Sequence, residues 1–253
     1  MSRESRCRTP HAATLSRRSF LALAMLARCS GVETASPPSI DEWRNGRFKA
    51  RPDSNVGRAS ARPNEPWLYV PPKMKEPAPL IVVLHGAGGR GERALEYVRD
   101  DADRIGAIVI APDSVGRTWD VIVDEIGPDV ERIDAQLELV FDSYAVDKER
   151  LAVSGFSDGA SYALTLGIAN GDLFTHVIAY SPGFLAPPSQ TGAPRIFISH
   201  GTRDEILPID RCSRRLVPGL QRAGYDVHYR EFDGGHTVPA EIANEAMEWF
   251  TKS

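Results

Sequence analysis

From residue 66 onward, short apolar runs alternate with amphipathic stretches that are long enough to form helices. This alternation is typical of a parallel sheet whose strands are joined by crossover helices. Most of the runs are continuously apolar, as expected when helices cover both faces of the sheet. The sequence therefore predicts an α/β fold with a doubly wound, mostly parallel sheet, helices on both faces and no separate lid domain. The predicted strands are 67–70, 80–84, 107–111, 151–154, 176–180, 195–199 and 227–232, and the predicted helices are 92–104, 130–144, 158–169, 210–223 and 239–251.

The charge of the chain limits its partners. After residue 31 the chain carries 24 Lys and Arg residues against 33 Asp and Glu residues, which is a net charge of −9. An acidic body repels phosphate at long range, so we expect neither nucleic acid nor an anionic membrane as a partner. The sequence shows no cluster of Cys and His with the spacing of a metal site, and we expect no metal and no cofactor.

The first 31 residues resemble an export signal. Ser16-Arg17-Arg18-Ser19-Phe20-Leu21 is similar to the twin-arginine motif, and an apolar stretch at 20–27 follows at once. Such a stretch is too short to span a bilayer. We expect cleavage after Gly31 and export by the twin-arginine route, to the periplasm or out of the cell. Lipid anchoring at Cys29 is the alternative, although Arg28 departs from the lipoprotein pattern.

Residues 32–65 are rich in Pro, Ser, Arg and Asn, with Trp43 and Phe48 as isolated apolar residues. This composition predicts a linker with short edge strands. We therefore expect three parts along the chain, which are the export signal at 1–31, the linker and edge strands at 32–65, and one folded domain at 66–253.

The motif Gly155-Phe156-Ser157-Asp158-Gly159 lies directly between a predicted strand and a predicted helix. A G-x-S-x-G sequence in this setting forms a sharp turn that lifts the serine hydroxyl to the top of a sheet. The two glycines let the backbone pack closely around that turn. The motif predicts Ser157 as a nucleophile.

A serine hydroxyl is a weak nucleophile and needs a base, which in turn needs an acid to orient it. Asp204 and His236 each follow a predicted strand, and the carboxyl ends of parallel strands meet at one edge of a sheet. We expect Asp204 to be the acid and His236 the base. Glu205 and Asp210 are the alternative acids, but Asp204 stands in the turn directly after its strand.

The loop His85-Gly86-Ala87-Gly88-Gly89 follows the predicted strand 80–84, and its small residues let backbone N–H groups turn inward toward a developing negative charge. We predict the N–H groups of Ala87 and Asp158 as the donors, because Asp158 also begins a helix with a favourable dipole. His85 and His200, which both precede glycines in turns, are expected to make structural hydrogen bonds.

A substrate pocket is predicted beside these residues, lined by Gly86, Trp119 and Phe156. For Trp119 the alternative is a buried position in the core, because aromatic side chains supply much of the buried area of a protein.

Together, the four motifs resemble the α/β-hydrolase superfamily, in particular the carboxylesterase/phospholipase and polyhydroxybutyrate-depolymerase-like (feruloyl-type) esterases. The resemblance covers about residues 66–250. It implies the α/β-hydrolase fold, a catalytic triad of Ser157, Asp204 and His236, and a backbone oxyanion hole at Ala87. The chain departs from many carboxylesterases after the nucleophile, where Asp158-Gly159-Ala160 stands in place of Gln-Gly-Gly, so the subfamily stays open.

The predicted function is a serine hydrolase that cleaves a small-molecule or polymer-derived carboxylic ester through an acyl-enzyme. Two alternatives stay open, because the same fold and triad serve several functions. One is a catalytically silent binding protein, and the other is an exported peptidase or thioesterase that uses the same triad.

Overall fold

The structure, a computed structural model, describes residues 45–52, 67–74, 76–123 and 126–252, all within one compact unit that spans 37–253. The predicted export signal with Cys29 lies outside the described residues, and so does the predicted linker apart from 45–52. In the described ranges, no helix combines the length and the apolar character needed to cross a membrane.

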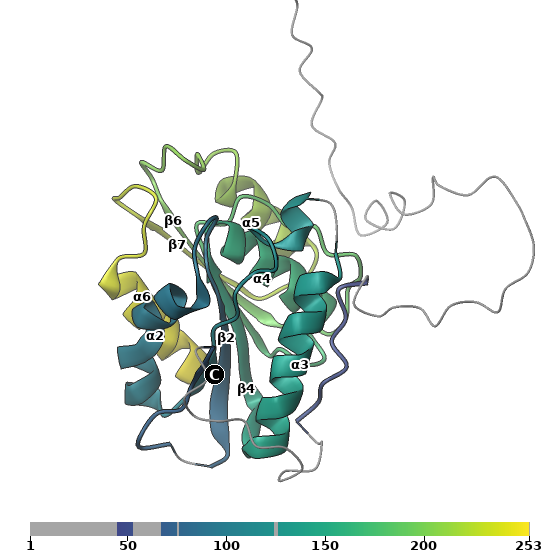
Figure 1. Cartoon of the computed structure of the whole chain (residues 1–253). Helices are drawn as coiled ribbons and strands as arrows, with labels where there is room; N and C mark the ends of the chain where they lie inside the picture. The colour runs from purple at the N-terminus through teal and green to yellow at the C-terminus, as the bar shows by residue number, and fades with distance from the viewer. Residues whose placement is uncertain (1–44, 53–66, 75, 124–125, 253) are drawn as a thin grey trace, which may run out of the picture. The chain divides into compact units, whose positions relative to one another are not determined.

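Seven strands form one sheet in the order β1-β3-β2-β4-β5-β6-β7 (Figure 1). Strand β1 runs antiparallel to β3, and all other neighbouring strands are parallel. All seven strands coincide with predicted runs, but β4 begins earlier than expected because its polar first residues, 147–150, hide the start. The strands are β1 (Leu68–Tyr69), β2 (Ala78–Leu84), β3 (Ile108–Ile110), β4 (Val146–Phe156), β5 (His176–Tyr180), β6 (Arg195–Gly201) and β7 (Val227–Phe232).

The helices fall where the amphipathic stretches predict them. Helix α5 begins later than expected because residues 208–212 form turns, in which the Cys212 N–H donates to the Ile209 carbonyl. In the described part of the chain, no inserted domain interrupts the succession of strands and helices. The helices are α2 (Gly91–Ile105), α3 (Pro128–Ser143), α4 (Asp158–Ala169), α5 (Ser213–Arg222) and α6 (Ala240–Thr251), with a 3-10 helix η2 (Asp120–Val123).

Helices α2 and α6 cover one face of the sheet, whereas α3, α4 and α5 cover the other (Figure 1). The predicted doubly wound α/β arrangement is thereby confirmed. Because side chains alternate along a strand, successive residues of β4 contribute to different layers. Val153 packs in the core under α3 and α4, and Ser154 lies on the face toward α2 and α6.

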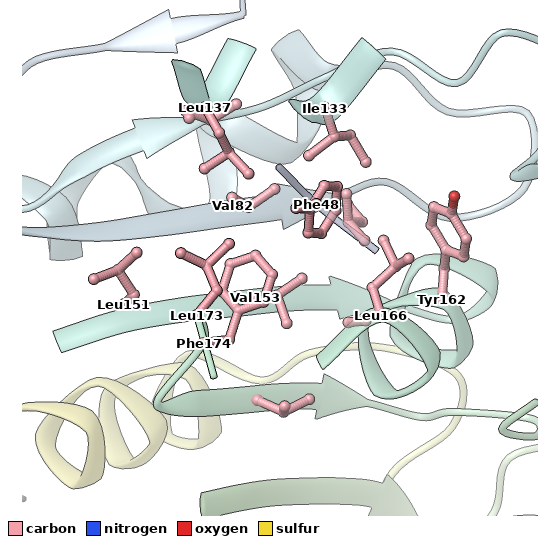
Figure 2. Packing of buried hydrophobic residues seen from close by; sticks show 14 of the residues in the cluster. Phe48, Val82, Ile133, Leu137, Leu151, Val153, Tyr162, Leu166, Leu173 and Phe174 are labelled. Carbon is pink, nitrogen blue, oxygen red and sulfur yellow. The ribbon is translucent and has the colours of Figure 1, made fainter. Parts of the chain in front are cut away.

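The largest core cluster lies between the sheet and helices α3 and α4, as Figure 2 shows. Phe48, from the segment 45–52, is buried there and packs edge-on against Phe174, with ring centroids 5.7 Å apart. The Phe48 N–H also donates to the Asn170 side-chain oxygen at 2.9 Å. This part of the predicted linker is therefore packed against the domain.

Candidate active site

Ser157 alone forms the turn between β4, which ends at Phe156, and α4, which begins at Asp158. Its backbone angles, φ 58° and ψ −120°, lie in a region that L residues rarely adopt. Such a conformation costs about 1–3 kcal/mol and persists only where the surroundings enforce it. One enforcing contact is the hydrogen bond from the Ser157 N–H to the Tyr180 carbonyl oxygen, at 3.0 Å.

The two glycines of the motif make this turn sterically feasible. A Cβ atom at Gly155 would collide with the backbone of Gly159, and a Cβ atom at Gly159 would collide with the carbonyl oxygen of Leu84. The turn therefore packs directly against the end of β2.

The side chains of Ser157, His236 and Asp204 lie in hydrogen-bonded sequence at the carboxyl edge of the sheet. His236 Nε2 is 2.9 Å from Ser157 Oγ, and His236 Nδ1 is 2.6 Å from Asp204 Oδ2. Each residue follows a different strand, β4, β6 or β7. His236 thus directly contacts both of the side chains that the sequence predicts to act with it.

Asp204 is almost fully buried, yet its carboxylate is well supplied with donors. Its Oδ1 accepts hydrogen bonds from the N–H groups of Leu207, at 2.8 Å, and Ile206, at 3.0 Å. Burial by itself would raise the pKa of Asp204, but the Leu207 N–H and the His236 ring outweigh it and hold that pKa below its usual value. The carboxylate is therefore ionised at neutral pH and orients the imidazole.

His200 lies behind this carboxylate. Its Nε2 donates to the Leu207 carbonyl oxygen at 2.8 Å, and its Nδ1 accepts from the Ser213 hydroxyl at 2.7 Å. Burial lowers the pKa of His200, so the ring is neutral at neutral pH. The expectation that His200 makes structural hydrogen bonds is confirmed.

His85 fixes the loop after β2. Its Nδ1 donates to the Gly86 carbonyl oxygen at 2.8 Å, and its Nε2 accepts from the Ser114 N–H at 3.0 Å. Because the C=O and N–H of a trans peptide point in opposite directions, this bond turns the Ala87 N–H away from His85. Among the described residues, no acceptor is bonded to that N–H.

Asp158 is the first residue of α4, where N–H groups have no partner within the helix. Its carboxylate accepts a hydrogen bond from the Thr118 hydroxyl at 2.7 Å, a contact that ties the loop before η2 to the turn at Ser157. Sequence reasoning missed Thr118, although it precedes Trp119 in a stretch that follows β3 at the same edge of the sheet. Gly86 lies close by, since a Cβ there would be 3.4 Å from Ser157 Cβ.

A cavity of about 340 Å³ opens beside these groups, on the face of the sheet that α2 and α6 cover. Gly86 and Phe156 line it, together with Ala87 and His236. The Phe156 ring lies 4.6 Å from the His236 ring, measured between centroids. Among the described residues, no group of three His, Cys, Asp or Glu side chains could hold a metal ion.

Trp119 does not line this cavity, so its predicted place in the pocket is wrong. The side chain is fully buried, its Nε1 donates to the His85 carbonyl oxygen at 2.8 Å, and its ring stacks on Tyr162. The alternative interpretation, a core aromatic, is the one that the structure supports. Trp119 supports the site by holding the backbone of His85 and by packing against its ring, with the centroids 4.6 Å apart.

The arrangement of the sheet and its helices has a parallel among solved structures. A phospholipase/carboxylesterase from Dyadobacter fermentans superposes with a TM-score of 0.57, covering 78% of this chain and 100% of that chain, at 19% identity. The chain has the α/β-hydrolase fold. No family model matches this chain.

The sequence of this chain is similar to those of carboxylic-ester hydrolases. NocK of Nocardia uniformis subsp. tsuyamanensis, described as an esterase, is 26% identical over 231 residues, which cover 79% of this chain and 67% of NocK. Feruloyl esterase C of Emericella nidulans is 31% identical over 143 residues, covering 53% of this chain and 52% of that enzyme. The chain thus matches about half the length of feruloyl esterase C.

Proposed function

We propose that the protein is a serine esterase that cleaves carboxylic esters through an acyl-enzyme. The observation that carries this proposal is the position of His236, whose two ring nitrogens contact Ser157 Oγ and Asp204 Oδ2. A histidine in this position can take a proton from the serine while the carboxylate stabilises the resulting imidazolium. The esterase relatives support the same reaction class.

In the first half-reaction, Ser157 Oγ forms a bond to the ester carbonyl carbon while its proton moves to His236 Nε2. The carbonyl oxygen becomes negative, and the N–H groups of Ala87 and Asp158 stabilise it. The bond from carbon to the leaving oxygen then breaks, and His236 returns the proton to the departing alcohol.

In the second half-reaction, a water molecule takes the place of the alcohol. His236 removes a proton from this water, the hydroxide oxygen bonds to the acyl carbon, and the carbon–Oγ bond breaks as Ser157 regains its proton. The carboxylic acid is released and the free site is restored.

Labelling with a fluorophosphonate probe, followed by hydrolysis of p-nitrophenyl esters of increasing chain length, tests this proposal. We expect the wild-type protein to be labelled and to turn over esters, and Ser157→Ala to do neither. The matched control is Ser161→Ala, because Ser161 lies in the same helix start but its hydroxyl is bonded to the Ser157 carbonyl and accepts the Gly183 N–H. A folded wild-type protein that takes no label would instead support the silent binding protein.

We also propose that the protein is exported by the twin-arginine route. The support is the motif Ser16-Arg17-Arg18-Ser19-Phe20-Leu21 and the apolar stretch behind it. The test is expression of the full chain, with and without the double change Arg17→Lys and Arg18→Lys, followed by cell fractionation. Export lost in the double variant supports the route, whereas equal export contradicts it. The mass of the exported amino terminus distinguishes cleavage after Gly31 from lipidation of Cys29.

A further inference from the structure

Residues 114–120 follow β3 and end at the first residue of η2, and we call them the bracing segment. Residues 114–118 are exposed or half-buried, and only Trp119 and Asp120 of the segment are buried. A surface segment with so few buried apolar contacts is held in place mainly by its hydrogen bonds. Those bonds extend in two directions, toward the proposed active site and toward α3.

Toward the site, the bracing segment is bonded to the loop 85–89 on both sides of Ala87. The Gly88 N–H donates to the Arg117 carbonyl oxygen at 2.9 Å. The Trp119 Nε1–H donates to the His85 carbonyl oxygen at 2.8 Å. The segment therefore fixes the backbone that carries the Ala87 N–H, the first of the two proposed oxyanion donors.

The same segment contacts the second proposed donor through Thr118. The Thr118 hydroxyl donates to Asp158 Oδ2 at 2.7 Å, and Asp158 is the first residue of α4. Within the described ranges, the Asp158 carboxylate has no other hydrogen-bond or ion-pair partner. Arg117 and Thr118, two adjacent residues, thus connect the elements that carry the two donors.

Toward α3, the bracing segment is held at both of its ends by Asp129, which is 1% exposed. Asp129 Oδ1 accepts a hydrogen bond from the Val115 N–H at 2.6 Å, and Oδ2 accepts one from the Asp120 N–H at 2.8 Å. Asp120 Oδ2 in turn accepts from the N–H groups of Gly127, at 2.9 Å, and Asp129, at 3.0 Å. The two aspartates therefore hold each other's backbone, and a loss of either carboxylate leaves buried N–H groups without acceptors.

We propose that the bracing segment sets the direction of both oxyanion donors at once, with Thr118 and Asp129 as its positioning residues. The inference rests on the proposed esterase function. Neither side chain lines the cavity beside His236, so each acts through the backbone of other residues. Donors stabilise an oxyanion at about 2.7–3.1 Å, and a displacement of about 1 Å is sufficient to slow a reaction strongly.

Thr118→Val is the main variant, because it removes the hydroxyl and keeps the shape of the side chain. Removal of an oxyanion donor costs about 10²- to 10³-fold in kcat, so we expect the displacement of one to cost about tenfold, with KM nearly unchanged. Thr118→Ser keeps a hydroxyl and is expected to restore most of the loss. The matched control is Thr175→Val, since the Thr175 hydroxyl is bonded to the Leu151 carbonyl at the opposite edge of the sheet. It is expected to keep kcat.

A double variant tests whether Thr118 acts through the carboxylate of Asp158. Asp158→Ala is expected to lower kcat for p-nitrophenyl acetate. If the hydroxyl and the carboxylate act as one unit, Thr118→Val causes no further loss in that background. An additional loss as large as the one that Thr118→Val causes in the wild type overturns the role of this bond.

Asp129→Ala and Asp134→Ala separate positioning from stability. Asp134 lies in the same helix, is 5% exposed and also accepts two backbone N–H groups, those of Lys49 and Ala50. Both variants leave N–H groups without an acceptor, so both are expected to unfold at lower urea concentrations. Only Asp129→Ala is expected to lower kcat in the folded protein. An equal loss of kcat in the two variants overturns the role of Asp129.

1,1,1-Trifluoroacetone measures the oxyanion donors directly, because it forms a tetrahedral adduct. Ser157 Oγ bonds to the carbonyl carbon, the serine proton moves to His236 Nε2, the carbonyl π electrons become a lone pair on an anionic oxygen, and no group leaves. We expect its Ki to rise in Thr118→Val and Asp129→Ala by the factor by which kcat/KM falls. The acid limb of kcat/KM against pH, which reports the free base His236, is expected not to shift. A fall in kcat/KM with an unchanged Ki overturns the inference.

The results separate this inference from the esterase proposal. An active wild-type protein whose kcat is not altered by Thr118→Val overturns the inference and leaves the esterase proposal standing. A folded wild-type protein that neither hydrolyses p-nitrophenyl acetate nor binds trifluoroacetone counts against the esterase proposal. In that event, amide hydrogen exchange of the Gly88 N–H, which donates to Arg117, decides the bracing on its own. We expect faster exchange in Asp129→Ala than in the wild type, and equal rates overturn the inference.

Discussion

His200 Nε2 lies 3.3 Å from Asp204 Oδ2, so a buried histidine flanks the same carboxylate that contacts the His236 ring. The neutral His200 is fixed by the Leu207 carbonyl, and the Leu207 N–H in turn donates to Asp204. The carboxylate is thereby held from two sides, and its orientation toward His236 does not depend on solvent.

Asp204→Asn is expected to lower kcat by about 10⁴-fold, because an amide in this position favours the wrong tautomer of the base. We expect KM to change little, since Asp204 makes no contact with the substrate. The kinetics of p-nitrophenyl acetate hydrolysis measure both constants. Asp210→Asn is the control, because Asp210 was the alternative acid and is instead ion-paired to Arg214 at the surface. A large loss of kcat in Asp210→Asn would contradict the assignment.

His85→Ala is expected to lower kcat by about 10- to 100-fold and to leave KM nearly unchanged. The change removes one of the two hydrogen bonds that hold the Gly86 carbonyl, and the Gly89 N–H remains as its other donor. The direction of the Ala87 N–H, which in the proposed reaction stabilises charge only in the transition state, is then less well fixed. Steady-state kinetics of a short ester provide the measurement. His228→Ala serves as the control, since this histidine is at the surface beside Glu245. An increase in KM with kcat unchanged would show that His85 contributes to substrate binding instead.

Gly159→Ala and Gly219→Ala are expected to change stability in opposite directions. A methyl group at position 159 would collide with the Leu84 carbonyl, and we expect a loss of at least about 2 kcal/mol together with most of the activity. At position 219, in α5, no atom lies within 4 Å of the added methyl group, so the helix gains about 0.5–1 kcal/mol. Urea unfolding measures both effects, and a neutral Gly159→Ala would contradict the packing at the nucleophile turn.

The buried His176 predicts a loss of stability in mild acid. Its ring packs edge-on against Trp249 and Phe250, and burial, reinforced by the positive charge of Arg195, lowers its pKa from 6.5 to about 4. Below pH 6.5 the unfolded chain binds a proton that the folded protein does not bind until about pH 4. The free energy of unfolding therefore falls across this interval, by up to about 3 kcal/mol from this group.

The measurement is urea unfolding at pH 7, 5.5 and 4.5, in the wild type and in His176→Phe. The variant keeps an aromatic ring at the site and is expected to lose less stability on acidification. The control is His228→Phe, whose native residue is solvent-exposed. An equal fall in the free energy of unfolding between pH 7 and 4.5 for the wild type and His176→Phe would contradict the prediction.

The sequence was sufficient to place the strands and helices because their apolar patterns are long and their boundaries are marked by Gly and Pro. It was also sufficient to bring Ser157, Asp204 and His236 to one edge, because the carboxyl ends of parallel strands converge whatever the details of packing. The start of β4 was missed because the polar residues 147–150 follow Val146. In this part of β4 only Val146 pairs with β2, opposite Ala78.

Other features depend on packing between residues distant in the sequence. The cavity forms where α2 meets α6, and more than a hundred residues separate these helices. Trp119 carries no local signal that distinguishes a core ring from a pocket ring, and its partner Tyr162 lies on another helix. The unpaired hydroxyl of Ser154 is equally invisible in the sequence, because only the final packing shows which polar atoms remain without partners.

The positive φ of Ser157 has an evolutionary consequence. Glycine adopts this conformation without a steric cost, so Ser157→Gly would make the fold more stable while removing the serine that we propose as the nucleophile. Retention of serine at this position is therefore opposed by selection for stability alone. A descendant of this chain that no longer needed the reaction would be free to drift to glycine, whereas a lineage that depends on it must keep a locally unfavourable residue at the top of the sheet.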